Sequence, residues 1–95
     1  DVKEGAFNVK IFDNVCSMNQ AQRVGGISVR ANDSFISGNI VFKNKGAGIR
    51  LGGDTEKFGI NNVVTSNFLD ANTLSALKVM REPQRKICGN KATNS

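Results

Sequence analysis

The segment Ile36-Ser37-Gly38-Asn39-Ile40-Val41-Phe42-Lys43-Asn44 decides the fold, because its pattern recurs along the chain. With Asn39 as the anchor, a β-branched apolar residue stands three positions before it and an asparagine stands five positions after it. Only the last copy departs from the pattern, because its second asparagine, Asn94, lies one position short. Successive anchors lie 25, 28 and 23 residues apart, and repeats of this length are typical of solenoid proteins. The anchors are Asn14, Asn39, Asn67 and Asn90.

A second motif keeps phase with the first. Gly48–Leu51 begins four residues after Asn44, and Ala76–Val79 begins four residues after Asn72. The corresponding segment Gly26–Val29 follows its asparagine by seven residues, which indicates a longer turn. Two motifs in phase favour stacked parallel coils over a small antiparallel β-protein whose strands look alike by chance. We therefore predict a single all-β domain, a parallel solenoid of about four coils over residues 1–24, 25–47, 48–74 and 75–95.

Stacked coils place equivalent residues above one another, so the repeat also predicts the core. β-Branched and large aliphatic residues suit the buried face of a parallel sheet. The anchor asparagines are expected at tight corners, because asparagine tolerates the left-handed backbone conformation and its amide can bond to the copies above and below. The expected inward ladders are Ile11/Ile36/Val64/Ile87, Val15/Ile40/Phe68 ending at Lys91, Ile27/Ile49/Leu77, and Val29/Leu51/Val79.

Charge and composition limit the partners. The chain has 95 residues, 13 Lys and Arg against 8 Asp and Glu, and a formal net charge of +5. A positive balance favours polyanions, which include acidic glycans, nucleic acids and anionic membrane surfaces. Nucleic acid is the less favoured partner, because no aromatic residues alternate with the basic ones to stack on bases. No apolar run is long enough to span a membrane, so we expect no membrane-spanning segment.

The two ends of the chain carry no capping pattern. The sequence opens on the polar stretch Asp1–Glu4, with no signal peptide, as in a mature or excised segment. It starts within one coil and stops on an anchor repeat, without an amphipathic helix to close the stack. We therefore expect a segment of a longer solenoid, or self-association through open coil ends, where unpaired strands can accept another strand.

The repeats also resemble those of a known family. Gly48–Leu51, Asn61–Val79 and Lys86–Asn90 are similar to the coils of right-handed parallel β-helix proteins, the pectate-lyase-like solenoids. That family includes pectate and alginate lyases, galacturonases, uronan epimerases and phage tailspikes. The resemblance implies a right-handed parallel β-helix, a secreted protein and a polysaccharide partner. It does not imply galacturonase or epimerase chemistry, because those family members use motifs with histidine and this chain has none.

The resemblance to lyases directs attention to one outward ladder. Family lyases neutralise a uronate carboxylate with Ca²⁺ or arginine and remove the adjacent proton with lysine or arginine. The second motif places Ser28, Arg50 and Lys78 in one outward ladder, flanked by Arg30 and Arg81. Arg50 and Lys78 are the catalytic candidates, since like-charge repulsion one layer apart would lower the lysine pKa. All four cations are candidates for binding an acidic polysaccharide; the alternative is a solvated face without a ligand.

A metal site has little support in the sequence. Asp54 and Glu56 lie in the loop Gly52–Gly59, next to the outward ladder, and are weak candidates for Ca²⁺. Two carboxylates are few for an ion that takes about six to eight oxygen ligands. We therefore expect no cofactor, with Ca²⁺ as the weak alternative.

The two cysteines are expected not to pair with each other; both remain unpaired, or one pairs with a partner outside this segment. Cys16 follows its anchor and Cys88 precedes an anchor three layers away, so their separation along the axis is about 14 Å. A disulfide requires Cα atoms within about 7 Å.

Asn32-Asp33-Ser34 matches the N-glycosylation sequon and favours secretion. The function expected from the sequence is therefore an extracellular protein that binds or processes acidic polysaccharide. The alternative is a structural or adhesive solenoid without catalysis.

Overall fold

The structure, a computed structural model, describes residues 1–21, 24–53 and 57–93. The described residues form strands and turns and contain no helix, as the repeat predicts. Most strands are three residues long, and the three strands of the second motif have five. The strands are β1 Lys10–Phe12, β2 Val15–Ser17, β3 Gly25–Val29, β4 Phe35–Ser37, β5 Ile40–Phe42, β6 Ala47–Leu51, β7 Val63–Thr65, β8 Phe68–Asp70, β9 Ser75–Val79, β10 Lys86–Cys88 and β11 Lys91–Thr93.

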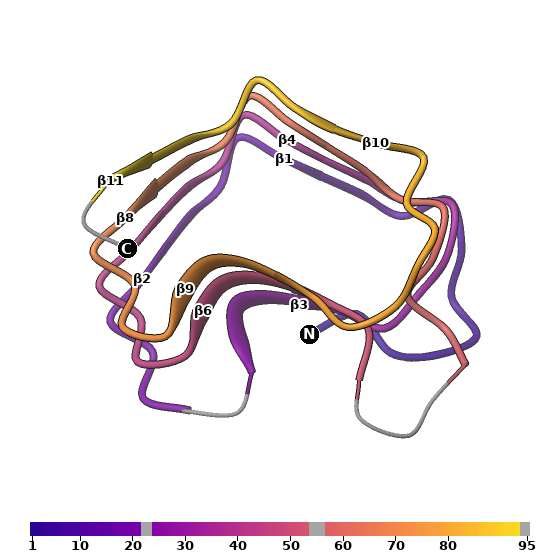
Figure 1. The fold of residues 1–95 in the computed structure, drawn as a ribbon, viewed down its shortest axis with the longest axis horizontal. Helices are drawn as coiled ribbons and strands as arrows, with labels where there is room; N and C mark the ends of the chain where they lie inside the picture. The colour runs from indigo at the N-terminus through magenta and orange to yellow at the C-terminus, as the bar shows by residue number, and fades with distance from the viewer. Residues whose placement is uncertain (22–23, 54–56, 94–95) are drawn as a thin grey trace.

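The strands stack into three parallel sheets that surround one core (Figure 1). Sheet 1 has the order β1-β4-β7-β10, sheet 2 has the order β11-β8-β5-β2, and sheet 3 has the order β3-β6-β9. The chain visits the three sheets in turn, so each circuit adds one layer to the stack. The result is a β-solenoid of about three turns, against about four coils expected. The difference arises in sheet 3, where the first layer holds only an isolated bridge from Val2 to Val29.

Three of the four predicted inward ladders are confirmed. Ile11, Ile36, Val64 and Ile87 are partners in sheet 1, and the two ladders of the second motif are partners in sheet 3. The residues in the middle layers are fully buried, because layers above and below cover them. Ile87 and Val79, in the last layer, are partly exposed. The core residues are Ile27, Val29, Ala31, Ile36, Val41, Ile49, Leu51, Val64 and Leu69.

The fourth predicted ladder was wrong. Val15, Ile40 and Phe68 are indeed partners in sheet 2, but their side chains are exposed. The anchor asparagine that precedes each of them points inward, so period-two alternation turns the next residue outward. The inward positions are one residue later, and they hold Cys16, Val41, Leu69 and Ala92. Lys91, which was expected to interrupt the core ladder, therefore lies on the outer face.

The four anchor asparagines form a continuous hydrogen-bonded ladder, as predicted. The side-chain oxygens of Asn39, Asn67 and Asn90 each accept bonds from the backbone and side-chain amides of the anchor one layer below. The side-chain amide of Asn39 in turn donates to the carbonyl oxygen of Ile11, 2.9 Å away. Asn67 and Asn90 repeat this bond with Ile36 and Val64. The ladder thus supplies hydrogen-bond partners for polar groups that are buried at this corner.

The anchors do not adopt the left-handed conformation that was predicted for them. At this corner, the residue before each anchor has positive φ, from Asp13 at 57° to Gly38 at 71°. A short polar residue or glycine tolerates this conformation, and the following asparagine is left to point inward. The tight turn lies where the repeat predicts it, but the left-handed conformation belongs to the residue before the anchor.

Two further corner ladders were not predicted. Asn19, Asn44 and Asn72 repeat the same bonding pattern where sheet 2 leads to sheet 3. At the corner before sheet 1, Ser34 and Gln84 stand at the position that Asn62 occupies in its own layer. The side-chain oxygen of each of the three accepts a bond from a backbone amide of the layer below. The change of residue type hid this third ladder from a search based on asparagine.

Candidate polyanion-binding face

The outward ladder of sheet 3 lies where the second motif places it. Ser28 is the partner of Arg50 between β3 and β6, and Arg50 is the partner of Lys78 between β6 and β9. Arg30 follows the end of β3, and Arg81 lies two residues beyond β9. Adjacent parallel strands lie about 4.8 Å apart, so Arg50 and Lys78 project from neighbouring layers of one sheet. We call Arg30, Arg50, Lys78 and Arg81 the basic face.

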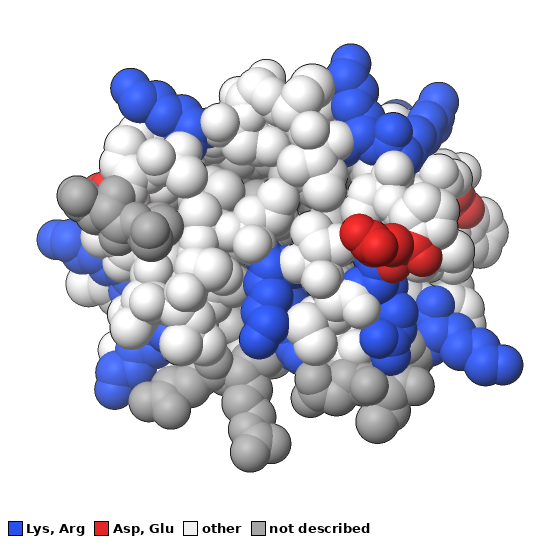
Figure 2. Space-filling view, viewed as in Figure 1, with Lys and Arg blue, Asp and Glu red and all other residues white. Residues whose placement is uncertain are grey.

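The members of the basic face differ in their access to solvent. Lys78 is exposed, and Arg81 is partly exposed. Arg50 was expected to project into solvent, but only 7% of its surface is exposed, so this expectation was wrong. Its central position, with a layer on each side, explains the burial. In Figure 2, basic side chains reach the surface at the lower centre of the molecule, the side where Figure 1 shows sheet 3.

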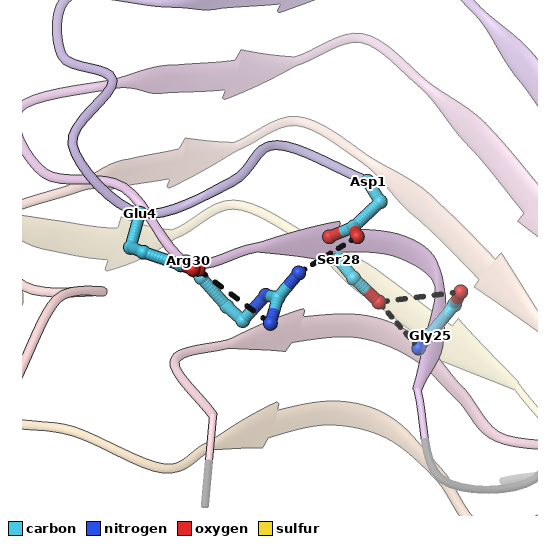
Figure 3. A network of polar contacts seen from close by, with 5 residues as sticks. All are labelled: Asp1, Glu4, Gly25, Ser28 and Arg30. Atoms are coloured by element: carbon cyan, nitrogen blue, oxygen red, sulfur yellow. Dashed lines mark hydrogen bonds and ion pairs between the residues drawn. The ribbon is translucent and has the colours of Figure 1, made fainter. Parts of the chain in front are cut away.

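Arg30 is already paired with carboxylates of the chain itself (Figure 3). Its guanidinium lies 2.9 Å from a carboxylate oxygen of Asp1 and 3.5 Å from one of Glu4. The backbone of Val2 holds this segment against β3, since it donates to Ser28 and accepts from Arg30. These partners were missed by sequence reasoning. The one signal in the sequence was the apolar Val2, which bridges to Val29, but no repeat motif surrounds it.

The turn after β9 positions Arg81. Its guanidinium donates to the carbonyl oxygen of Met80 at 3.0 Å. The side-chain amide of Gln84 donates to the carbonyl oxygens of Arg81 and Gly59, and so joins this turn to the segment that precedes sheet 1. The side-chain stem of Arg81 packs over Gly52, where a Cβ would approach the arginine Cγ to 2.8 Å. Glycine at this position allows the arginine to lie close to the backbone.

Ser28 contributes a hydroxyl that is used inside the molecule. Only 5% of Ser28 is exposed, and its oxygen accepts a bond from the backbone amide of Gly25 at 2.7 Å (Figure 3). The hydroxyl therefore stabilises the start of β3 rather than facing solvent. Of the outward ladder, Lys78 is the member whose side chain is most accessible to a ligand.

The weak metal candidates cannot be placed. Asp54 and Glu56 lie outside the described residues. Within residues 1–21, 24–53 and 57–93, no three side chains of His, Cys, Asp or Glu gather in a way that could hold a metal ion.

The cysteines are unpaired, as predicted. Cys16 is half-buried beneath Val41 in the inward ladder of sheet 2, and Cys88 is exposed beside Thr65 in sheet 1.

The sequon residue Asn32 has a structural role in the fold. Its side-chain oxygen accepts bonds from the backbone amides of Gly59 and Ile60, at 2.9 and 3.0 Å. Ser34 of the same sequon is fully buried, whereas Asn32 is half-buried and Asp33 is exposed.

Among the described residues, no helix has the length and apolar character needed to cross a membrane. No family model matches the chain, and no match was found among curated proteins or among solved structures.

Proposed function

We propose that this chain is an extracellular module that binds acidic polysaccharide along the outer face of sheet 3. The observation that carries the proposal is the exposed Lys78 on β9, the register partner of the buried Arg50 on β6, with the partly exposed Arg81 close to the end of β9. Lys78 and Arg81 are the cations of this face that can contact carboxylates of an acidic polysaccharide. Charge-assisted hydrogen bonds between ammonium or guanidinium groups and carboxylates are the expected contacts.

The choice of a polyuronate rests on the chemistry of this face. It has cations without an aromatic residue among the partners Ser28, Arg50 and Lys78, so it offers no platform on which a nucleic-acid base could stack. The net charge of +5 supplies long-range attraction for any polyanion. The similarity of the repeats to pectate-lyase-like coils favours uronates within that class. We also propose that the chain belongs to that family and that its solenoid is right-handed.

Binding rather than turnover is the function that we assign. Lyase chemistry would need Lys78 to take the proton next to the uronate carboxylate. The released electron pair would form a carbon–carbon double bond, while the glycosidic carbon–oxygen bond breaks and its oxygen takes a proton. A cation must also contact the carboxylate, and Arg50 is largely covered. Lys78 alone can bind a carboxylate, but it does not supply both roles.

A structural or adhesive solenoid is the second candidate. Two observations favour it. Arg30 is paired with Asp1 and Glu4, and Arg50 is buried, so part of the basic face stabilises the fold itself. In that case, the remaining exposed cations are solvated and have no glycan partner.

One experiment separates these functions. The chain would be applied to a panel of alginate, pectate and glycosaminoglycans, with neutral glycans as controls, and the same glycans would be incubated with it while the ultraviolet absorbance of unsaturated uronate is followed. Binding to acidic glycans without a rise in absorbance is the expected result. A rise in absorbance would instead assign lyase activity. Absence of both would contradict the proposal and leave the structural solenoid.

A further inference from the structure

A row of large apolar side chains lies on the outside of the solenoid, at the corner where sheet 1 meets sheet 2. Val15, Ile40 and Phe68 are register partners on β2, β5 and β8, so they form a single file along the solenoid axis. Phe12, at the end of β1, lies across the corner from Val15. We call these four residues the apolar crest. Their exposed fractions are 48% for Phe12, 65% for Val15, 44% for Ile40 and 37% for Phe68.

The fold does not need apolar residues at these positions. The core below this corner is filled by Ile36, Val41, Leu69 and their neighbours, none of which belongs to the crest. A residue on the outer face of a sheet is free to be polar, as Ser37 and Thr65 are in the adjoining positions of sheet 1. Exposed apolar side chains that lie together, rather than singly, mark a surface that contacts something apolar.

Lysines border the crest. Lys91 is the partner of Phe68 and continues its file into the last layer. Lys10 and Lys86 lie on the outer face of sheet 1, each two residues before the end of its strand. Figure 2 shows the same arrangement, with white side chains over the corner at the top of the view and blue side chains on either side. Asp13 lies at the crest and Asp70 lies two residues after Phe68 on the same face of β8, so three lysines face two carboxylates and the local balance remains positive.

We infer that the apolar crest and its lysine border dock on an anionic lipid surface. The aromatic and aliphatic side chains would enter the boundary between headgroups and acyl chains, and the lysines would contact the anionic headgroups. The sequence excludes a membrane-spanning run of apolar residues, which does not bear on surface binding. The basic face of sheet 3 lies on a different side of the solenoid (Figure 1), so the two surfaces can act independently.

The shape of the corner favours a lipid surface over an acidic protein. Two sheets meet there at an outward angle, so the apolar side chains project from a ridge (Figure 1). A fluid bilayer adapts to a ridge, whereas a folded protein would need a matching hollow. The crest side chains project from the sheet faces, whereas strand addition uses the backbone groups of an edge strand, so strand addition does not explain the apolar side chains in the middle strands β5 and β8.

The test measures binding of the full chain to phosphatidylcholine vesicles with and without phosphatidylglycerol by co-sedimentation. We expect binding that depends on the anionic lipid. The double variant Ile40→Ser/Phe68→Ser should weaken it on the order of tenfold or more, because it removes the inserted apolar surface. The double variant Lys86→Gln/Lys91→Gln should weaken it by about fivefold for each lysine, which corresponds to about 1 kcal/mol per charge near the surface.

Matched variants remove similar groups elsewhere. Phe7→Ser/Leu74→Ser deletes two exposed apolar side chains away from the crest, and Lys3→Gln/Lys57→Gln deletes two exposed charges. Both controls should bind vesicles nearly as the unchanged chain does, and thermal unfolding should show that every variant is folded. Failure to bind anionic vesicles, or equal losses in crest and control variants, would overturn the inference. Self-association that the crest variants abolish, without vesicle binding, would assign the crest to a second copy and would also overturn it.

Discussion

Asn39 and Asn67 are joined by two hydrogen bonds that end on one atom. The side-chain oxygen of Asn67 accepts from the backbone amide of Asn39 at 3.0 Å and from its side-chain amide at 2.9 Å. Both residues are buried, so neither donor can turn to water instead. Each layer therefore needs the asparagine of the next layer as a hydrogen-bond acceptor. This need explains why asparagine recurs at this position of the repeat.

Asn67→Ala should destabilise the fold strongly. It removes the acceptor of two buried donors of Asn39 and the donor that satisfies the carbonyl oxygen of Ile36. Each buried group left without a partner costs about 1–3 kcal/mol, so the total loss should be roughly 3 kcal/mol or more in chemical denaturation. Asn14→Ala is the control, because Asn14 is the exposed end of the ladder and its loss should cost about 1 kcal/mol. Equal losses would show that the buried ladder has no special role.

Ile49→Ala should cost about 2–5 kcal/mol, because Ile49 is fully buried in the middle layer and its truncation leaves a cavity. The same substitution at Ile40, on the outer face, should cost about 1 kcal/mol or less. Urea midpoints of the two variants compare them directly. If Ile40→Ala were the more damaging, the assignment of inward and outward faces in sheet 2 would be reversed.

Gly48→Ala should also destabilise the protein. A Cβ at this position would lie 2.5 Å from the carbonyl oxygen of Ala76 and 2.8 Å from the side-chain amide nitrogen of Asn72. Both groups belong to the neighbouring layer, and the carbonyl is backbone that cannot simply rotate away. We expect a loss of about 1–3 kcal/mol, as for other overpacked sites. Thermal unfolding that is unchanged by this substitution would show that the layers separate easily at this corner.

The sequence predicted the stacking register of the fold but not the direction of every side chain. Two motifs in phase were enough to pair Ile36 with Val64 and Arg50 with Lys78, because register follows from equal spacing. The direction of Ile40 could not be obtained in this way. It depends on whether Asn39 points inward, and an asparagine is more often found outside than inside. The buried hydrogen bonds of Asn39 decide the question, and they appear only when neighbouring layers are in place.

The candidate site was predicted in its position but not in its accessibility. Spacing placed Arg50 and Lys78 on one ladder, whereas their different exposure depends on the neighbouring layers. The pairing of Arg30 with Asp1 and Glu4 joins residues far apart in the sequence. The repeat pattern does not indicate this pairing, because the segment 1–7 forms isolated bridges rather than a full strand.

Arg50→Gln should destabilise the fold and Lys78→Gln should not, although each variant removes one positive charge. Arg50 is buried, so its replacement removes packing of the side-chain stem, at a cost of about 1–3 kcal/mol. Lys78 is exposed, and its replacement should leave the unfolding midpoint nearly unchanged. Equal midpoints for the two variants would show that Arg50 is solvated and contributes nothing to the fold.

The most direct test of the proposed function compares two double variants that remove the same charge. Lys78→Gln/Arg81→Gln neutralises the accessible part of the basic face, and Lys43→Gln/Lys45→Gln neutralises two exposed lysines elsewhere. The measurement is the affinity for a polyuronate at low and at physiological salt. We predict that the first double variant loses on the order of tenfold at low salt and less as salt rises, while the second loses little. Equal losses in both, or no loss in the first, would contradict binding at the basic face.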